Sequence, residues 1–266
     1  MSSEQLDEDS ILRGLKTRRF GRPLVVVDEC GSTNDVVKGM AESGAPNGLV
    51  VIAETQTAGR GRLGRAWYSP RGGVWLSILV KAQELPSFLN CLPLVGALGI
   101  VKPLVEKWGL KARVRWPNDV VVGWRKIAGV SVESKSKGNE LIYAILGIGI
   151  NANFDTNKIA PISGASASLL TLLGGPVNRE NLITVILSET EKMCESLYAS
   201  GGKDLVVLLR ELDCSRGEHV KVRTPEREVV GTVDDYESLS RVRIITRDGF
   251  ESIETSALVS VDYQSD

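Results

Sequence analysis

The stretch Gln56-Thr-Ala-Gly-Arg-Gly-Arg-Leu-Gly-Arg-Ala-Trp67 gathers arginines and glycines into one short segment that has almost nothing to bury. No acidic residue occurs from Thr55 to Gln83, so these arginines and Arg71 are not balanced by neighbours in the sequence. Glycine lets a backbone approach a ligand closely, and clustered cations attract anions. The segment therefore predicts a loop around a phosphate-bearing ligand, although a solvated surface loop or an RNA-binding element also fits the segment alone.

Two glycine patterns match dinucleotide-binding fingerprints by letter. Residues 59–64 read GxGxxG and residues 147–152 read GxGxxA. Such a fingerprint binds pyrophosphate only where a strand precedes it and a helix follows it. Pro70 and Gly72 follow the first pattern, and Asn153 and Pro161 follow the second, so neither segment continues as a helix. We therefore reject a dinucleotide-binding fold, and no Gly-Lys-Ser/Thr of a P-loop occurs in the sequence.

Short runs rich in β-branched residues surround the arginine segment and predict a mixed sheet flanked by helices. The expected strands span 24–29, 49–54, 74–80, 112–116, 119–122, 127–133 and 140–150. The residues 32–35 offer capping side chains for a helix, and 89–108 and 179–198 are longer helical candidates. We expect the helix in 89–108 to start near Pro93 and to kink or stop near Pro103.

The last part of the chain reads differently, as short strands separated by turns. Alternating runs at 219–223, 229–233, 241–245 and 251–254 predict a small β-barrel or sandwich. We therefore expect two units, 1–213 and 214–266, that touch each other.

Composition restricts the function classes. A formal net charge of -1 and a pI near 6.1 argue against a general DNA or RNA binder. The first ten residues are acidic and polar, unlike a signal peptide, and we expect no segment of membrane-spanning length and a cytoplasmic location. The cysteines lie far apart with one histidine in the chain, so reduced structural thiols are expected rather than zinc ligands or a disulfide framework.

Three further polar signals are weak when taken singly. Trp116-Pro-Asn-Asp119 places an amide and a carboxylate after a strand, where they fit a nucleotide or hydrated magnesium but also ordinary turn chemistry. Lys126 begins a strand that contains Gly129. Its ammonium fits either a ligand-binding cation or an exposed charge at a strand end. Asn151 follows the run 147–150, as a ligand contact or a strand cap.

Together and in this order, these motifs resemble the biotin protein ligases. The resemblance rests on Glu29-Cys-Gly-Ser-Thr-Asn34, the segment 53–70, Trp116-Pro-Asn-Asp119, Lys126-Ile-Ala-Gly129, Gly147-Ile-Gly-Ile-Asn151 and the C-terminal β unit. It implies an α+β fold of the class II synthetase-like, biotin–lipoate ligase type with a C-terminal SH3-like barrel. Because the Ser-Thr-Asn motif begins at residue 32, the monofunctional type without an N-terminal DNA-binding domain is expected, with no specific DNA binding.

The resemblance also implies roles for individual residues. Biotin binding falls to Ser32, Thr33, Asn34, Gln56, Arg60, Gly61, Arg62 and Lys126. ATP binding falls to Arg62, Arg65, Trp67, Asn118, Asp119, Lys126 and Asn151. Lys126 and Arg62 are the expected catalytic residues, ATP and biotin the substrates, and Mg²⁺ a cofactor near Asp119. The implied partner is a biotin carboxyl carrier domain, with no membrane partner and a possible homodimer.

Two departures and two alternatives complete the expectation. Arg115 stands where the family often has lysine, which leaves its role open, and the C-terminal unit has Asp234-Asp-Tyr-Glu-Ser-Leu-Ser240 where we expect an Asp-Gly hairpin turn. A lipoate protein ligase of the same fold and a non-enzymatic Arg/Gly-loop nucleic-acid binder are the alternative functions.

Overall fold

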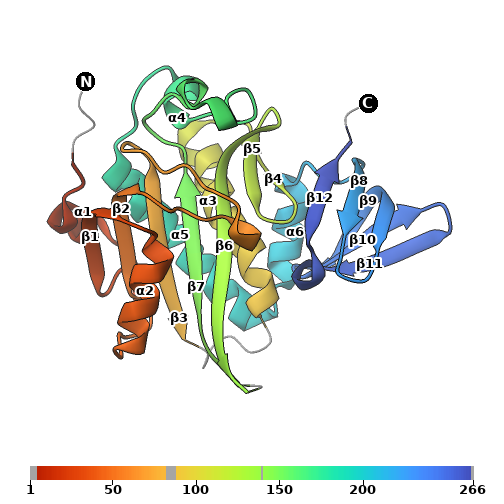
Figure 1. The fold of residues 1–266 in the computed structure, drawn as a ribbon, viewed down its shortest axis with the longest axis horizontal. Coiled ribbons are helices and arrows are strands. Elements are labelled where there is room, and N and C mark those ends of the chain that lie inside the picture. The colour runs from red at the N-terminus through yellow and green to blue at the C-terminus, as the bar shows by residue number, and fades with distance from the viewer. Residues whose placement is uncertain (1–4, 82–87, 139, 265–266) are drawn as a thin grey trace.

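The computed structural model describes residues 5–81, 88–138 and 140–264, which form two sheets with helices around the larger one (Figure 1). The seven-stranded sheet has the order β1-β2-β3-β7-β6-β5-β4. Its strands are β1 (Leu24–Cys30), β2 (Val50–Gln56), β3 (Val74–Lys81), β4 (Ala112–Arg115), β5 (Asp119–Val122), β6 (Arg125–Lys137) and β7 (Glu140–Ile150). Strands β1 and β2 are parallel and the other neighbours are antiparallel, which confirms the mixed sheet.

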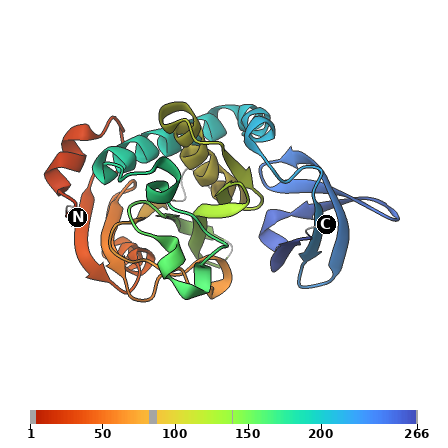
Figure 2. The ribbon, with the colours of Figure 1, turned by 90° about the horizontal axis from the view of Figure 1, so that it is seen from above.

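One face of this sheet is the main hydrophobic core. Because side chains alternate along a strand, Leu76 and Ile78 of β3 and Leu146 and Ile148 of β7 face the same side. Helix α3 (Leu92–Trp108) packs against this face, and α5 (Arg179–Ser200) packs against α3. Figure 2 shows the two helices together on one side of the strands.

Helix α3 starts near Pro93 as predicted but does not stop near Pro103. It starts at Leu92 and runs through Pro103 to Trp108 without stopping. Gly96 and Gly99 allow close packing, since a Cβ there would meet Val130 of β6 and Thr190 of α5. This packing on both sides holds the helix despite the backbone hydrogen bond that proline cannot donate.

The same segment corrects our expectation about membrane-spanning length. Leu89–Trp108 is long and apolar enough to cross a membrane by length and composition, but 67% of it is buried inside the protein. A helix enclosed by sheet and helix is apolar around most of its circumference, as a membrane span also is. The segment is therefore the central core helix.

The other face of the sheet carries helix α2 (Thr33–Glu42). Its second hydrophobic cluster includes Val37 of α2, Val51 of β2 and Ile145 of β7. Towards the N-terminus of α2 this face changes to serine and glycine, with Ser77 on β3 and Gly147 on β7. These small residues leave space above the sheet, where the site is formed.

The C-terminal sheet confirms the expected small β unit and adds one strand. It has the order β11-β10-β9-β8-β12 and is antiparallel. Its strands are β8 (His219–Arg223), β9 (Glu228–Ser238), β10 (Arg241–Thr246), β11 (Gly249–Glu254) and β12 (Ser260–Tyr263). The residues expected to replace a hairpin turn belong mostly to β9, and the turn between β10 and β11 is Arg247-Asp248, directly before Gly249. The boundary at 213/214 stays a prediction.

Three helices were not predicted. They are α1 (Glu8–Gly14), α4 (Leu169–Leu173) and α6 (Lys203–Leu212). Helix α6 follows α5 directly and packs against both β4 and β9, so it connects the two sheets.

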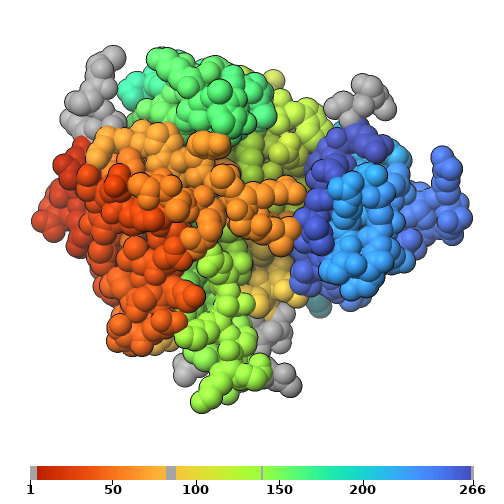
Figure 3. Space-filling view, viewed as in Figure 1, coloured from red at the N-terminus to blue at the C-terminus, as the bar shows by residue number. Residues whose placement is uncertain are grey.

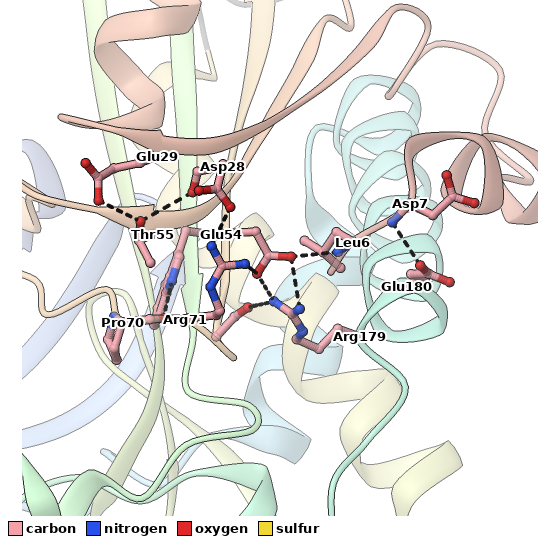
Figure 4. A network of polar contacts seen from close by, with 12 residues as sticks. Leu6, Asp7, Asp28, Glu29, Glu54, Thr55, Pro70, Arg71, Arg179 and Glu180 are labelled. Atoms are coloured by element: carbon pink, nitrogen blue, oxygen red, sulfur yellow. Dashed lines mark hydrogen bonds and ion pairs between the residues drawn. The ribbon is translucent and has the colours of Figure 1, made fainter. Parts of the chain in front are cut away.

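A buried ion pair fixes the base of the arginine segment to the rest of the fold (Figure 4). Arg179 donates to both carboxylate oxygens of Glu54 at 2.7 and 3.1 Å, with the two side chains 3% and 0% exposed. The Leu6 amide also donates to Glu54, and Arg179 donates to the Gly73 carbonyl. The pair thereby ties β2, the N-terminal segment, α5 and the residue before β3 to one another.

Candidate active site

A single cavity of about 540 Å³ collects almost all the predicted site residues. It lies between the N-terminus of α2, the arginine segment, the middle of β6 and β7, the 116–119 turn and residues 259–263 of the C-terminal unit. Its lining includes Ser32, Thr33, Asn34, Gln56, Arg60, Gly61, Arg62, Arg65, Trp67, Asn118, Asp119 and Lys126. Among the predicted residues, Asn151 is not part of this lining.

Glycines on β6 and β7 form the floor of the cavity. A Cβ at Gly149 would lie 2.5 Å from the indole nitrogen of Trp67, and one at Gly129 would lie 3.1 Å from the same ring. A Cβ at Gly147 would meet Ser131 and Asn34 at 2.6 and 2.7 Å. Gly147 and Gly149 alternate with isoleucines that face the core. The two glycines leave room for the side chains of Asn34 and Trp67 to lie against the sheet, and they are not part of a dinucleotide fingerprint.

Hydrogen bonds order the polar end of the cavity. The Gln56 amide oxygen accepts from the Thr33 backbone N–H at 2.8 Å and from its hydroxyl at 3.1 Å. Ser77, buried under the helix, lies 2.6 Å from the Thr33 hydroxyl and donates to Asn34 at 2.6 Å. Asn34 in turn donates to Glu133 at 2.8 Å. Thr33, Asn34 and Gln56 of this network stand in the sequence motifs, whereas Ser77 and Glu133 look like ordinary strand residues in the sequence and were not predicted.

The arginine segment is a small hairpin. Gly61 donates to the Arg65 carbonyl at 2.8 Å, and Trp67 donates to the Gly59 carbonyl at 2.9 Å. Arg60 points to the N-terminal turn of α2 and donates to both oxygens of Asp35 at 2.7 Å. This hydrogen bonding lowers the pKa of the Asp35 carboxyl.

Two of the arginines therefore have acidic partners that are distant in the sequence. Arg60 is paired with Asp35, and Arg71 is paired with Asp28 and lies 3.6 Å from Glu54. Asp35 and Asp28 both lie outside the segment 55–83, which has no acidic residue of its own. Arg62 and Arg65 both line the cavity. Among the described residues, no carboxylate lies within ion-pair distance of either guanidinium.

Arg62 reaches across the cavity to two other parts of the chain. It donates to the Asn118 side-chain oxygen and to the Leu258 carbonyl, both at 3.3 Å. Burial lowers the pKa of its guanidinium, and the nearby Asp119 charge opposes that effect. Asn118 is itself fixed, because its amide donates to the Val130 carbonyl at 2.7 Å.

Lys126 and Arg115 both pair with Asp119. The Lys126 ammonium lies 2.5 Å from one carboxylate oxygen and Arg115 lies 2.9 Å from the other. Lys126 also lies over the Trp67 ring, 4.9 Å from its centre, a cation–π arrangement. The structure thus gives Arg115 a contact: it helps hold the aspartate that positions Lys126.

Asn151 lies behind Lys126. Its side-chain amide donates to the carbonyls of Lys126 at 3.3 Å and Ala167 at 3.1 Å. Its backbone N–H donates to Ile127 at 2.8 Å. These bonds give Asn151 a supporting position at the start of β6, and its part in ATP binding stays a prediction.

The C-terminal unit forms one wall of the cavity, which was not predicted from the sequence. Residues 259–263 line the cavity, and the Tyr263 hydroxyl donates to the Trp116 carbonyl at 2.8 Å. The same hydroxyl lies 2.9 Å from Ser215, which accepts from the Trp116 N–H. Since these residues lie about 150 positions from the motifs they contact, their spacing in the sequence gave no signal.

Comparisons with known proteins agree with this geometry. The model of the biotin/lipoate A/B protein ligase family matches residues 27–151. The biotin--[acetyl-CoA-carboxylase] ligase of Mycobacterium tuberculosis is 31% identical over 245 residues, covering 89% of this chain and 89% of that protein. The bifunctional ligase/repressor BirA of Bacillus subtilis is 29% identical over 251 residues, covering 94% of this chain and 77% of that protein.

A solved structure extends the likeness to the whole fold. The biotin protein ligase from Aquifex aeolicus in complex with biotin and ATP has a TM-score of 0.79 and 25% identity, covering 93% of this chain and 100% of that chain. The mycobacterial similarity spans both units and the family model spans the motifs that line the cavity. The chain therefore belongs to the biotin/lipoate A/B protein ligase family and, within it, to the biotin protein ligases.

Proposed function

We propose that this chain attaches biotin to a lysine of a biotin carboxyl carrier protein in two steps. In the first, a biotin carboxylate oxygen attacks the α-phosphorus of ATP, and the bond to pyrophosphate breaks. In the second, a lysine amine attacks the acyl carbon of biotinyl-5′-AMP, AMP leaves, and the nitrogen loses a proton. The observation that carries the proposal is the convergence of an ordered polar end and a cationic middle in one cavity.

The polar end suits the ureido ring of biotin. That ring has two N–H donors and one carbonyl acceptor, so it needs partners of both kinds. Ser32, Thr33 and Gln56 bring hydroxyl and amide groups to this end, and the Ser77 and Asn34 contacts restrict how they turn. Pre-ordered partners reduce the entropy lost on binding.

The cationic middle suits the meeting of two anions. Like charges about 4 Å apart repel by roughly 4 kcal/mol at an effective dielectric of 20. Arg62, Arg65 and Lys126 line the cavity where this repulsion has to be offset. We assign Lys126 and Arg62 to the reacting carboxylate and phosphate, because both are held towards Asn118 and Asp119 by recorded contacts.

The nucleotide is assigned to the Trp67 side of the cavity. The indole ring presents an aromatic face there, and Asn118 and Asp119 lie near Lys126. Both Asp119 oxygens contact cations, and no group of three histidine, cysteine or acidic side chains fit for a metal occurs in residues 5–81, 88–138 and 140–264. This donor set does not fit a protein-held Mg²⁺ near Asp119, so we derive no step through the ion.

Biotin-dependent exchange of labelled pyrophosphate into ATP tests the first step. We expect exchange with biotin and not with lipoate, which the family description also includes. Adding a biotin carboxyl carrier domain then tests the second step, by mass spectrometry of the carrier. Exchange that depends on lipoate instead of biotin would favour the lipoate ligase, and exchange with neither would overturn the proposed activity.

A further inference from the structure

Two exposed apolar residues adopt a left-handed backbone conformation, which is unfavourable for residues that carry a side chain. Among the described residues, Leu63 (φ 55°) and Trp124 (φ 67°) are the non-glycine residues with positive φ. Their exposed fractions are 64% and 44%. The left-handed region is unfavourable for an ordinary residue with a side chain, and glycine or asparagine adopts it more easily. Strained residues of this kind concentrate at functional sites.

One of the two residues lines the cavity, and the other contacts a residue that lines it. Leu63 is part of its lining, at the tip of the arginine hairpin. Trp124, in the turn between β5 and β6, packs on Tyr263 with ring centres 5.5 Å apart, and Tyr263 also lines the cavity. A third apolar side chain, Val259, lines the cavity and is 43% exposed. We call Leu63, Trp124 and Val259 the apolar rim.

The apolar rim comes from separate parts of the chain that meet around the reacting groups. Figure 3 shows the arginine segment, in orange, reaching across the front of the molecule to the C-terminal unit, in blue. Arg62, next to Leu63, hydrogen-bonds the carbonyl of Leu258, next to Val259. This hydrogen bond joins the residues next to Leu63 and Val259, which both line the cavity.

The size of a lysine side chain determines what must cover this rim. An extended lysine carries its amine only about 6 Å from its own Cα, given ordinary bond lengths. An acceptor lysine can therefore reach an acyl group in the cavity only if the protein around it rests on the mouth. A small substrate entering the cavity has no such need.

We propose that the apolar rim is the docking surface for the acceptor carrier domain and contributes to its binding in the second step. The inference rests on the proposed biotin transfer. The rim takes no part in forming or breaking bonds: the acceptor amine attacks the acyl carbon, the bond to the AMP phosphate breaks, and the amine proton is lost. The expected consequence is an effect on the KM for the carrier that is larger than any effect on the adenylation step.

The test uses substitutions that remove apolar surface and suit the backbone. Leu63→Asn and Trp124→Asn keep a residue that tolerates positive φ, and Val259→Ser completes the triple variant. Val207→Asn and Phe250→Thr are matched controls, since both side chains are exposed, apolar and absent from the cavity lining. Three reactions are measured. They are pyrophosphate exchange, reaction of the biotinyl adenylate with the small neutral nucleophile hydroxylamine, and biotinylation of the carrier over a range of carrier concentrations.

We expect the KM for the carrier to rise at least about tenfold in the triple variant, the scale of truncating apolar anchors in an interface. In the single variant Trp124→Asn, whose side chain is not part of the cavity lining, exchange and hydroxylamine reaction should stay within about twofold of wild type while the KM for the carrier rises. The controls should match wild type in all three assays. An unchanged KM for the carrier, or an equal loss of pyrophosphate exchange, overturns the inference. Absence of exchange in the wild-type protein would instead count against the proposed activity.

Discussion

At the scale of single residues, Lys126 is the sharpest test of the site. It is held between Asp119 and the Trp67 ring, so its ammonium is already positioned in the cavity. We expect Lys126→Ala to keep the fold and to slow adenylate formation by about 100-fold or more, the scale of losing one electrostatic stabiliser. Pyrophosphate release measures this rate, and Lys135→Ala, which removes an exposed pair with Glu42, is the control. Wild-type release by Lys126→Ala would contradict the assignment.

The thiols give a second residue-scale prediction. Cys91 and Cys214 carry free thiols, and burial raises the pKa of Cys91 to about 11 and of Cys214 to about 12. Only the thiolate reacts with alkylating reagents, so at pH 8 both residues should react far more slowly in the folded protein than in urea. Mass spectrometry after timed iodoacetamide treatment measures the difference. Equal rates with and without urea would show that these thiols are not protected by the fold.

The residues of the site could be predicted better than their partners. Ser32, Gln56 and Lys126 stand in motifs of fixed order, so the sequence alone brought them into one list. The ion pair of Arg60 with Asp35 joins a loop to a helix, and neither residue type nor spacing indicates it. The same holds for Ser77, whose hydroxyl matters because a helix terminus lies above it.

At the scale of elements, the arginine hairpin carries a prediction about ligand binding. Arg62 and Arg65 face the cavity, and we expect anions there to reduce their mutual repulsion and order the segment from Gly59 to Gly73. Biotin and ATP together should slow tryptic cleavage at these two arginines. Arg247, in the turn between β10 and β11, is the internal control and should be cut at an unchanged rate. Unaltered cleavage at Arg62 and Arg65 would rule out closure of the hairpin over the ligand.

Elements with a strong sequence pattern were predictable and those defined by packing were not. Strand β7 is visible in the sequence because 141–150 is a continuous run of apolar residues and glycine, rich in isoleucine. The course of α3 through Pro103 depends instead on its close contact with β6 and α5. Strand β12 was missed because its four residues pair with β8 and lack a hydrophobic run of their own.

At the scale of the whole molecule, the buried pair of Glu54 and Arg179 predicts a large effect on stability. Arg179→Met leaves a buried carboxylate without its main partner and should cost about 3–5 kcal/mol of unfolding free energy. Urea denaturation measures it. Lys135→Met, which loses only an exposed pair with Glu42, should leave the free energy of unfolding nearly unchanged.

A double variant separates the pair from simple packing. Glu54→Leu combined with Arg179→Met removes both charges, so its loss should be smaller than the sum of the two single losses. Strict additivity of the three measurements would show that the two side chains do not depend on each other.

The wall formed by residues 258–263 has a consequence for protein synthesis. A ribosome completes residues 24–151, with every predicted ligand contact, long before it adds Leu258 and Tyr263. Until those two residues bind Arg62 and Trp116, the cavity stays open on one side. An open site admits water, which destroys reactive acyl intermediates. A nascent chain would thus hold the parts of the site without being able to protect its product, and activity would begin only when the last strand has joined the sheet.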